Sequence, residues 1–397
     1  MILKKTLAEV AKAQRKNLKD TGIEREMLKK ISLNQQMIQV ISGIRRSGKS
    51  TLMKQLMKKI KKYYYFNFED IRSIGFTVKD FEKLDEIFKE NFGESNHYFF
   101  DEIQNVPEWE RFIRQKHDEG KKIIITGSNA SLLSRELGTK LTGRHLTYEL
   151  FPFSYKEMLK LKGKKESIKT LREYLNKGGF PEYLKYEKTE ILQELLKDIL
   201  ARDIIVRHKL KDSKIIKELT IYLISNIGKE FSYNKLKEYF NTGSTNTIIS
   251  YISFLEDSFV LFTVPRFDYS LKKQIINPKK IYAIDTGLIR ANTTSFTLDD
   301  GRIIENAVFL HLRKKYKEIF YYKGNRECDF LVKEGTKITQ AVQVCNILTE
   351  ENKQREIEGL QEAMQKFNLK KGTIITMNQK DKIENVEIIP LIEFFKR

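Results

Sequence analysis

Short apolar runs alternate with amphipathic segments over the first 130 residues of the chain. The apolar runs lie at residues 37–42, 63–68, 98–101 and 122–126, and apolar residues at helical spacing fill residues 77–91 and 108–119. Uninterrupted apolar runs are typical of strands that are buried on both faces, and their alternation with helices predicts a parallel sheet. This part is therefore predicted to be an α/β domain with a ligand at the carboxyl ends of its strands.

A glycine-containing loop follows the first predicted strand. Residues 43–51 read Gly-Ile-Arg-Arg-Ser-Gly-Lys-Ser-Thr and lead into a predicted helix at residues 52–61. A strand, this loop and a helix form the context of a Walker A motif, in which backbone amides and the helix dipole hold phosphates. Lys49 is predicted to reach the β- and γ-phosphates of ATP, and Ser50 to ligate Mg²⁺. The predicted nucleotide-binding residues are Gly43, Arg45, Arg46, Ser47, Gly48, Lys49, Ser50 and Thr51.

Two acidic residues end another predicted strand. Residues 97–102 read His-Tyr-Phe-Phe-Asp-Glu. A carboxylate at a strand end can hold the magnesium shell, which suits Asp101, and the next residue, Glu102, would orient or deprotonate the attacking water. The alternative is a strand that merely ends in a solvated acidic turn.

Polar residues after the next strands complete the predicted catalytic set. The strand at residues 122–126 leads to Gly127, Ser128 and Asn129, where Ser128 or Asn129 could sense the γ-phosphate, although an ordinary turn is an equal alternative. Arg144 is a candidate arginine finger or sensor, in its own chain or in a neighbouring one, because a guanidinium stabilises charge on phosphoryl oxygens. The alternative for Arg144 is a surface ion pair.

The middle of the chain is predicted to be helical and then to form a winged helix. Residues 155–210 carry apolar residues at three- and four-residue spacing, which suits a helical lid over the nucleotide. Residues 214–264 read as three helices and a strand, the order of a helix-turn-helix with a wing. Polar residues begin the third helix and two lysines follow the wing, so the predicted DNA contacts are Ser244, Thr245, Asn246, Thr247, Lys272 and Lys273. Ordinary helix capping, or a winged helix that contacts protein, is the alternative.

The C-terminal region has the pattern of a restriction-like nuclease. After Arg302 it reads helix, strand, strand, helix, strand, with Glu305 on the helix, Asp329 on a strand and Gln343 on the next. Such nucleases use a Glu, an Asp and a Glu-x-Lys pair, in which the carboxylates hold a metal and the lysine helps the nucleophile. Here Gln343 and Cys345 replace the last two groups, which predicts a degenerate fold that grips DNA or docks against the ATPase without cleaving.

Composition narrows the class of partner. The chain has 73 Lys and Arg against 53 Asp and Glu, a net charge of +20, which favours DNA or RNA as a partner. A lysine-rich proteome is the alternative. A hydrophobic content of 40% argues against disorder, and two cysteines are too few for a disulfide framework or a zinc site. Without a membrane-length apolar run or a signal-peptide core, a cytoplasmic location and no membrane partner are expected.

Several of these motifs occur together in a known family. The chain contains the arginine-rich Walker A, Tyr-Phe-Phe-Asp-Glu-Ile-Gln at 98–104, Ile-Thr-Gly-Ser-Asn at 125–129, Gly-Arg at 143–144, Phe-Pro-Phe-Ser at 151–154 and Gly-Gly-Phe-Pro-Glu-Tyr at 178–183. In this order they resemble the prokaryotic AAA+-like ATPases of the AAA domain family 14 type. The resemblance implies an AAA+ core, a helical lid at about 155–205, a winged helix and a nuclease-like C-terminal fold.

The sequence thus predicts a P-loop α/β fold with three further parts. The expected domains are an ATPase core at residues 1–150, a lid at 151–212, a winged helix at 213–275 and the nuclease-like α/β domain at 276–397. The expected function is Mg²⁺-dependent ATP hydrolysis coupled to binding or remodelling of DNA, duplex or branched. A nucleotide-controlled protein–protein switch and an ATP-dependent nuclease are the alternatives, and a homo-oligomer stays open.

Overall fold

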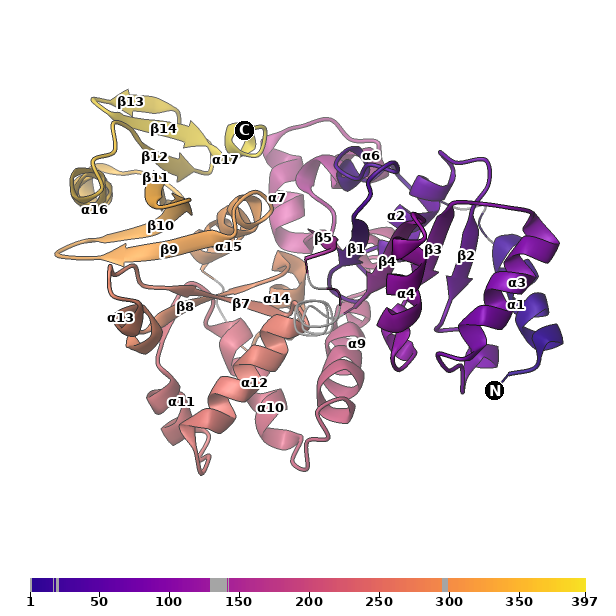
Figure 1. The fold of residues 1–397 in the computed structure, drawn as a ribbon. Helices are drawn as coiled ribbons and strands as arrows, with labels where there is room; N and C mark the ends of the chain where they lie inside the picture. The colour runs from indigo at the N-terminus through magenta and orange to yellow at the C-terminus, as the bar shows by residue number, and fades with distance from the viewer. Residues whose placement is uncertain (1, 17, 19–20, 129–140, 142, 295–298) are drawn as a thin grey trace. The chain divides into compact units, whose positions relative to one another are not determined.

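The computed structural model describes residues 2–16, 18, 21–128, 141, 143–294 and 299–397 (Figure 1). The chain divides into two compact units, residues 1–153 and residues 154–397. Each unit has its own sheets.

The first unit is built on a parallel sheet. Within the described residues it has five strands in the order β2-β3-β4-β1-β5. They are β1 (Ile38–Ser42), β2 (Tyr64–Asn67), β3 (His97–Asp101), β4 (Lys122–Gly127) and β5 (His145–Glu149). The predicted parallel α/β fold is confirmed. The edge strand β5 was not predicted, because its residues His-Leu-Thr-Tyr-Glu are half-buried or exposed and form no apolar run.

Helices cover both faces of this sheet, which explains why its central strands β1, β3 and β4 are buried at nearly every position. One face packs against α1 (Lys4–Lys16), α3 (Asp80–Phe92) and α4 (Trp109–Asp118), and the other against α2 (Lys49–Met57). Along β3, for example, Tyr98 and Phe100 lie in the first core and Phe99 in the second. Short 3₁₀ turns lie at η1 (Glu26–Lys29), η2 (Ile71–Ser73) and η3 (Ile103–Asn105).

The second unit begins with a helical part. Its elements are α6 (Tyr155–Lys162), α7 (Ile168–Lys177), α8 (Pro181–Tyr186), α9 (Glu190–Asp198) and the π-helix η4 (Ile199–Val206). Helix α14 (Thr286–Asn292), much later in the chain, packs against α7 and α9. The buried carboxylate of Asp285 accepts the N–H of Gly179, and a Cβ on Gly178 would lie 2.2 Å from the same carboxylate. Close approach of these two turns therefore explains the Gly178-Gly179 pair.

A small antiparallel sheet follows, and helices alternate with its strands along the chain. The order along the chain is α10 (Lys214–Ser225), β6 (Glu230–Phe231), α11 (Tyr233–Tyr239), α12 (Thr245–Asp257), β7 (Leu261–Pro265), α13 (Leu271–Ile276) and β8 (Lys279–Ala283). The sheet order is β6-β8-β7. The boundary expected between residues 275 and 276 falls inside α13 and would separate the paired strands β7 and β8, so the small sheet extends to residue 283.

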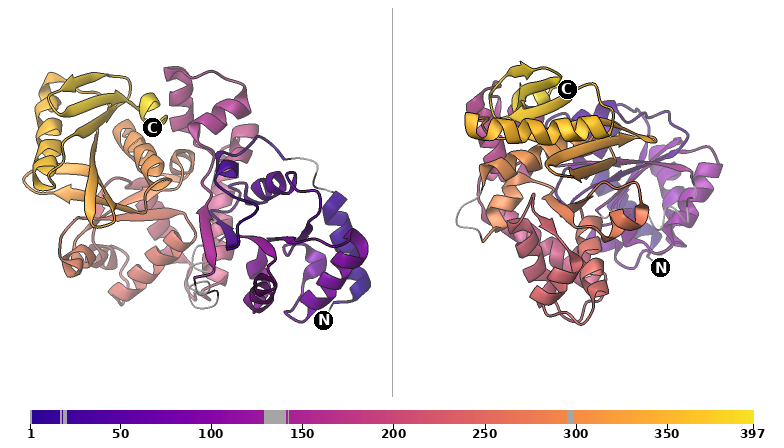
Figure 2. Two further views of the ribbon diagram at one scale, coloured as in Figure 1. Left: turned by 45° about the horizontal axis from the view of Figure 1, so that its top comes forward. Right: turned by 90° about the vertical axis from the view of Figure 1, so that its left-hand side faces the viewer.

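The remaining residues form a larger mixed sheet in the order β13-β14-β12-β11-β10-β9. Its elements are α15 (Asp300–Arg313), β9 (Glu318–Lys323), β10 (Glu327–Glu334), β11 (Lys337–Val344), α16 (Glu350–Lys366), β12 (Gly372–Thr376), β13 (Asp381–Ile383), β14 (Val386–Pro390) and α17 (Leu391–Phe394). Helix α16 packs across β10, β11 and β12 (Figure 2). The sequence pattern predicted two strands between α15 and α16, but a turn at residues 324–326 divides the first of them into β9 and β10.

Candidate active site

The loop at residues 43–48 joins β1 to α2 at the carboxyl edge of the first sheet. Gly43 has a φ of 150°, and a Cβ there would lie 2.2 Å from the carbonyl oxygen of Leu150. Gly48, directly before α2, has a φ of 96°, and Arg46 also has a positive φ, 62°. The helix was predicted to begin at residue 52, but it begins at Lys49. Both glycines are therefore required by the backbone, as a phosphate-binding loop needs.

The ammonium of Lys49 lies inside this loop. Its Nζ donates to the carbonyl oxygens of Gly43 at 3.0 Å and Ile44 at 3.2 Å. The same Nζ lies 3.8 Å from Oε1 of Glu102, and the Lys49 side chain is only 4% exposed. Lys49 of the motif and Glu102, the acid that directly follows β3, are far apart in the sequence and are thus brought together.

Asp101 ends β3 and is fully buried. Its carboxylate accepts hydrogen bonds from the Tyr65 hydroxyl at 3.3 Å, from the Thr126 hydroxyl and from the Ser50 side chain. Burial raises the pKa of Asp101, the negative charge of Glu102 raises it further, and the bonds from Thr126 and Ser50 oppose this rise. The Ser50 hydroxyl beside a carboxylate is a set of hard oxygen donors, the ligands that Mg²⁺ prefers.

Glu102 follows in an unusual backbone conformation. Its φ and ψ are 52° and 45°, in the left-handed region that non-glycine residues seldom adopt. Its N–H donates to the Thr126 hydroxyl at 2.9 Å, and its carboxylate accepts a bond from the Gln104 amide. Strained backbone of this kind is concentrated at functional sites, because the surrounding structure must hold it.

Thr126 on β4 is the residue that sequence analysis missed here. Its hydroxyl accepts from Glu102 and donates to Asp101, so it orders both acids. Thr126 could have been recognised in the sequence, because it is the single hydroxyl residue in the apolar run of β4. Of the two residues predicted as sensors directly after this strand, Ser128 is buried, whereas Asn129 lies outside the described residues.

Arg144 is not brought to this site within its own chain. It precedes β5, whose first residue, His145, pairs with Ile38 at the start of β1. Arg144 therefore lies at the amino edge of the sheet, whereas the phosphate loop lies at the carboxyl edge. Its guanidinium pairs with Asp118 of α4 at 2.9 Å and is 43% exposed, which matches the surface ion pair named as the alternative. A role at the site of its own chain is not supported, and action on a neighbouring subunit stays a prediction.

Arg25 takes a position that no sequence pattern indicated. The residue is 3% exposed. Its guanidinium donates to the carbonyl oxygen of Ser47 in the loop at 2.6 Å and to that of Phe151 at 2.8 Å, and it lies 4.8 Å from the centre of the Phe153 ring. Arg25 thus joins the phosphate loop to the segment that follows β5.

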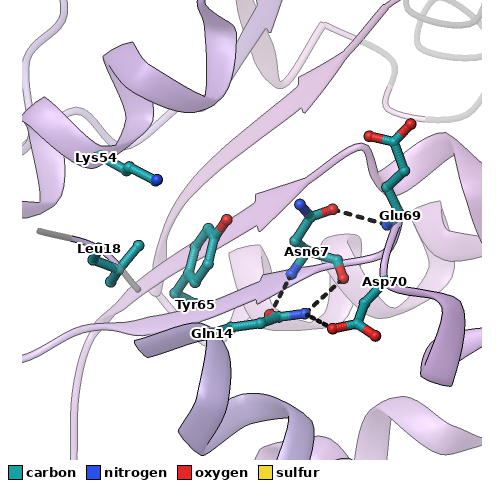
Figure 3. A pocket seen from close by; sticks show the side chains of 7 residues that line it. All are labelled: Gln14, Leu18, Lys54, Tyr65, Asn67, Glu69 and Asp70. Carbon is teal, nitrogen blue, oxygen red and sulfur yellow. Dashed lines mark hydrogen bonds between the residues drawn. The ribbon is translucent and has the colours of Figure 1, made fainter. Parts of the chain in front are cut away.

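A cavity of about 300 Å³ lies beside the acidic end of β3 (Figure 3). The Tyr65 ring lines it, and the Tyr65 hydroxyl reaches Asp101. Glu69, also in its wall, pairs with Arg45 of the loop at 3.3 Å. The remaining lining residues are Gln14, Leu18, Lys54, Asn67 and Asp70. The cavity therefore borders the candidate site on the side of β2.

The predicted DNA contacts lie at two places on the small-sheet part of the second unit. Ser244 caps α12 by accepting the N–H of Asn246 at 3.1 Å, and both residues are exposed. Thr245 and Thr247 are half-buried in the first turn, and the Thr245 hydroxyl donates to Asn234 of α11 at 3.2 Å. The two lysines, Lys272 and Lys273, are exposed on α13.

The predicted nuclease-like residues are brought together around a residue that was not predicted. Glu305 on α15 and Asp329 on β10 both contact the ammonium of Lys280 on β8, at 3.2 and 3.0 Å. Gln343 on β11 accepts the N–H of Asp329 at 3.0 Å.

Comparison with known proteins agrees with this geometry. Residues 35–159 match the AAA domain model AAA_14, and residues 168–298 match a domain of unknown function, DUF8612. The uncharacterized protein MJ1544 of Methanocaldococcus jannaschii is 37% identical over 391 residues, which cover 89% of this chain and 87% of that protein. The chain belongs to this AAA-domain family of P-loop ATPases.

Other members and solved structures are more distant from this AAA-family chain. An uncharacterized protein of Haemophilus influenzae is 30% identical over 324 residues, covering 76% of this chain and 80% of that protein. The Walker-type ATPase PABY2304 of Pyrococcus abyssi has a TM-score of 0.43 at 13% identity, covering 73% of this chain and 95% of that chain. AMPPCP-bound DnaA from Aquifex aeolicus has a TM-score of 0.28 at 14% identity, covering 64% and 89%. None of the helices in the described ranges combines the length and hydropathy needed to cross a membrane.

Proposed function

We propose that this AAA-family protein binds Mg·ATP at residues 43–51, hydrolyses it, and couples the nucleotide state to DNA binding. The observation that carries the hydrolytic part is the convergence of Lys49, Ser50, Asp101 and Glu102 at one edge of the sheet. Each group has the chemistry that its position requires. The membership in an AAA-domain family supports the same conclusion.

Each residue of the proposed site would have a separate role in ATP hydrolysis. Lys49 would exchange its contacts with the Gly43 and Ile44 carbonyls for phosphate oxygens. Ser50 and Asp101 would hold Mg²⁺, which supplies positive charge for the phosphoryl oxygens when it is bound. Glu102, with its carboxylate held by Gln104, would orient and deprotonate the attacking water.

The DNA-binding part rests on topology and charge. The order α10, β6, α11, α12, β7, α13, β8 with a three-stranded sheet supports a winged helix that carries α13 between its last two strands. In a winged helix the N-terminal turn of the third helix meets the major groove. Ser244 and Asn246 are exposed at that turn, Lys272 and Lys273 are exposed between β7 and β8, and the chain carries a net charge of +20. We propose duplex or branched DNA as the polyanion.

Two measurements test the two halves of the proposal. ATP hydrolysis is measured with and without duplex, single-stranded and four-way-junction DNA, with Lys49→Ala as the blank. Loss of hydrolysis in this variant is expected, and stimulation by one DNA form would name the substrate. If Lys49→Ala still hydrolysed ATP, the assignment of the site would be contradicted. If the wild type hydrolysed ATP at the same rate with and without every DNA form, only the coupling to DNA would be contradicted.

The DNA contacts are tested by the salt dependence of binding. Replacing Lys272 and Lys273 by alanine should reduce the slope of log K against log salt by about 2, since each phosphate contact contributes about 0.9. The matched control replaces the exposed pair Lys370 and Lys371, which lies before β12, and should leave the slope unchanged. If both double substitutions reduced the slope equally, DNA binding would depend on the overall positive charge of the chain and not on Lys272 and Lys273 in particular.

One observation favours the alternative of a protein–protein switch. Around the two lysines of α13, four apolar side chains are exposed by 62% to 78%: Tyr269, Leu271, Ile275 and Ile276. Exposed apolar groups in such a cluster are typical of protein contacts. Binding of DNA that weakens steeply with salt would favour the winged-helix proposal, and its absence would favour the switch.

A further inference from the structure

The side chain of Lys280 is enclosed by carboxylates in the second unit. Lys280 lies on β8, the middle strand of the small sheet, and its side chain is 4% exposed. Its Nζ lies 2.6 Å from Glu327, 3.0 Å from Asp329 and 3.2 Å from Glu305. An ammonium has three N–H donors, so these three acids can satisfy all of them.

Two carboxylates of this cage are themselves held in place. Oε1 of Glu305 also accepts the hydroxyl of Tyr282 at 2.6 Å. The second oxygen of Asp329 accepts the N–H of Val344 at 3.0 Å, on the neighbouring strand β11. Hydroxyl and backbone donors thus fix the two buried acids, whereas the third, Glu327, has a side chain that is 37% exposed.

The charges explain why a cation must lie there. Burying carboxylates together is unfavourable unless a cation compensates them. Burial by itself would lower the pKa of Lys280, but Asp329, Tyr282, Glu305 and Glu327 outweigh it and raise that pKa well above its usual value. The three carboxylate contacts within 3.2 Å thus favour the charged form of Lys280.

We propose that Glu305, Glu327 and Asp329 form a carboxylate cage of the kind that binds a divalent metal ion. In this chain the ammonium of Lys280 occupies the cage in place of the metal. Glu305 and Asp329 are the acids that a restriction-like nuclease would use for metal, and the ammonium lies where both can reach it. With Lys280 between them, no group of three or more His, Cys, Asp or Glu in the described part of the chain is arranged to hold a metal ion.

The cage also joins two parts of the second unit. Lys280 belongs to the small sheet, whereas Glu305 lies on α15, and Glu327 and Asp329 lie on β10 of the large sheet. The ammonium therefore ties the proposed winged helix to the nuclease-like sheet without a metal. This inference rests on the contacts of Lys280 and does not depend on the proposed ATP or DNA chemistry.

The test uses the full chain, without nucleotide, and MnCl₂ as the probe. Binding of Mn²⁺ is followed by its electron paramagnetic resonance signal in the wild type, in Lys280→Met and in Lys280→Met combined with Asp329→Asn. Methionine has a similar length but no charge. We expect Lys280→Met to bind Mn²⁺ at least about tenfold more tightly than the wild type, because the cage then lacks its cation. The double variant should lose this gain.

Three outcomes would overturn the proposal. The first is Mn²⁺ binding by the wild type that disappears in Glu305→Gln, and the second is DNA cleavage by the wild type in Mn²⁺ that disappears in the same variant. The third is a Lys280→Met protein that folds but gains no Mn²⁺ binding. If Lys280→Met does not fold, the double variant with Asp329→Asn decides. It should recover soluble protein, since one charge of each sign is removed, and its failure to do so would also refute the charge argument.

Discussion

Replacing Arg25 by methionine should weaken both the first unit and its phosphate loop. Arg25 is buried, and its guanidinium donates to the Ser47 and Phe151 carbonyl oxygens at 2.6 and 2.8 Å. Methionine keeps much of the volume and the contact with the Phe153 ring but has no donor. The variant therefore removes the two hydrogen bonds with little change in packing.

The magnitude follows from these two bonds. A hydrogen bond from a charged group contributes about 1.5–3 kcal/mol, so the two together contribute about 3–6 kcal/mol to the free energy of unfolding. With a urea dependence of about 2 kcal/mol per molar, the midpoint of the first unit should fall by about 1.5–3 M. Loss of the bond to Ser47 should also loosen the loop, and we expect ATP to bind about tenfold more weakly, which corresponds to about 1.4 kcal/mol.

The chain offers a selective probe for this measurement. Trp109 is its only tryptophan and lies buried in the first unit, so its fluorescence in urea reports the unfolding of that unit. ATP affinity is measured separately, below the unfolding transition, by displacement of a fluorescent nucleotide. Arg111→Met is the matched control, because Arg111 lies in the same unit, is 69% exposed and forms an ion pair with Glu108, which is itself exposed.

Two results would refute the reasoning. A change of less than about 0.5 kcal/mol, the range of ordinary surface substitutions, would show that the buried guanidinium does not hold the unit together. A large loss of stability with unchanged ATP affinity would show that the bond to Ser47 does not shape the loop.

Three further predictions concern single positions. Gly43→Ala should destabilise the first unit by about 2–4 kcal/mol in the tryptophan assay, because its Cβ would meet the Leu150 carbonyl at 2.2 Å. Glu102→Gln should retain ATP binding but lower kcat at least about 100-fold in a phosphate-release assay, since the amide cannot take a proton. Burial raises the pKa of Asp285 from 3.8 to about 6, so protonation favours the folded state. The resulting stability is present below about pH 4 and is lost as the pH rises through 6, by up to about 3 kcal/mol, and Asp285→Asn should flatten this slope in urea unfolding followed by circular dichroism.

Matched substitutions separate the causes in each case. Gly75 also has a positive φ, 84°, but nothing lies within 4 Å of its Cβ position, so Gly75→Ala should cost only about 1–2 kcal/mol. Glu82 is exposed in the same unit, and Glu82→Gln should leave kcat unchanged. Equal losses at the two glycines, equal rates in the two glutamine variants, or a pH slope that persists in Asp285→Asn would contradict the respective argument.

The sequence by itself predicted the candidate nucleotide site to the level of residues. Lys49, Ser50, Asp101 and Glu102 could be selected because the requirements of a phosphate loop are local: glycines at fixed spacing, a helix start, and acids at the end of an apolar strand. The parallel order of the central strands followed from the same kind of pattern, since strands covered on both faces are apolar at every position.

Only the tertiary structure decided which distant side chains meet. Arg25, Thr126 and Lys280 resemble ordinary residues in the sequence, because their roles depend on partners that are remote along the chain. Arg144 lies in a motif that attracted attention, yet the pairing of β5 with β1 places it at the opposite edge of the sheet from the phosphate loop. The periodicity of a sequence indicates which face of a helix or strand is buried. It does not indicate which opposite charge will lie beside a buried charge, because that partner comes from a distant part of the chain. For that reason the position of Lys280 among Glu305, Glu327 and Asp329 follows only from the folding of β8, α15 and β10 against one another.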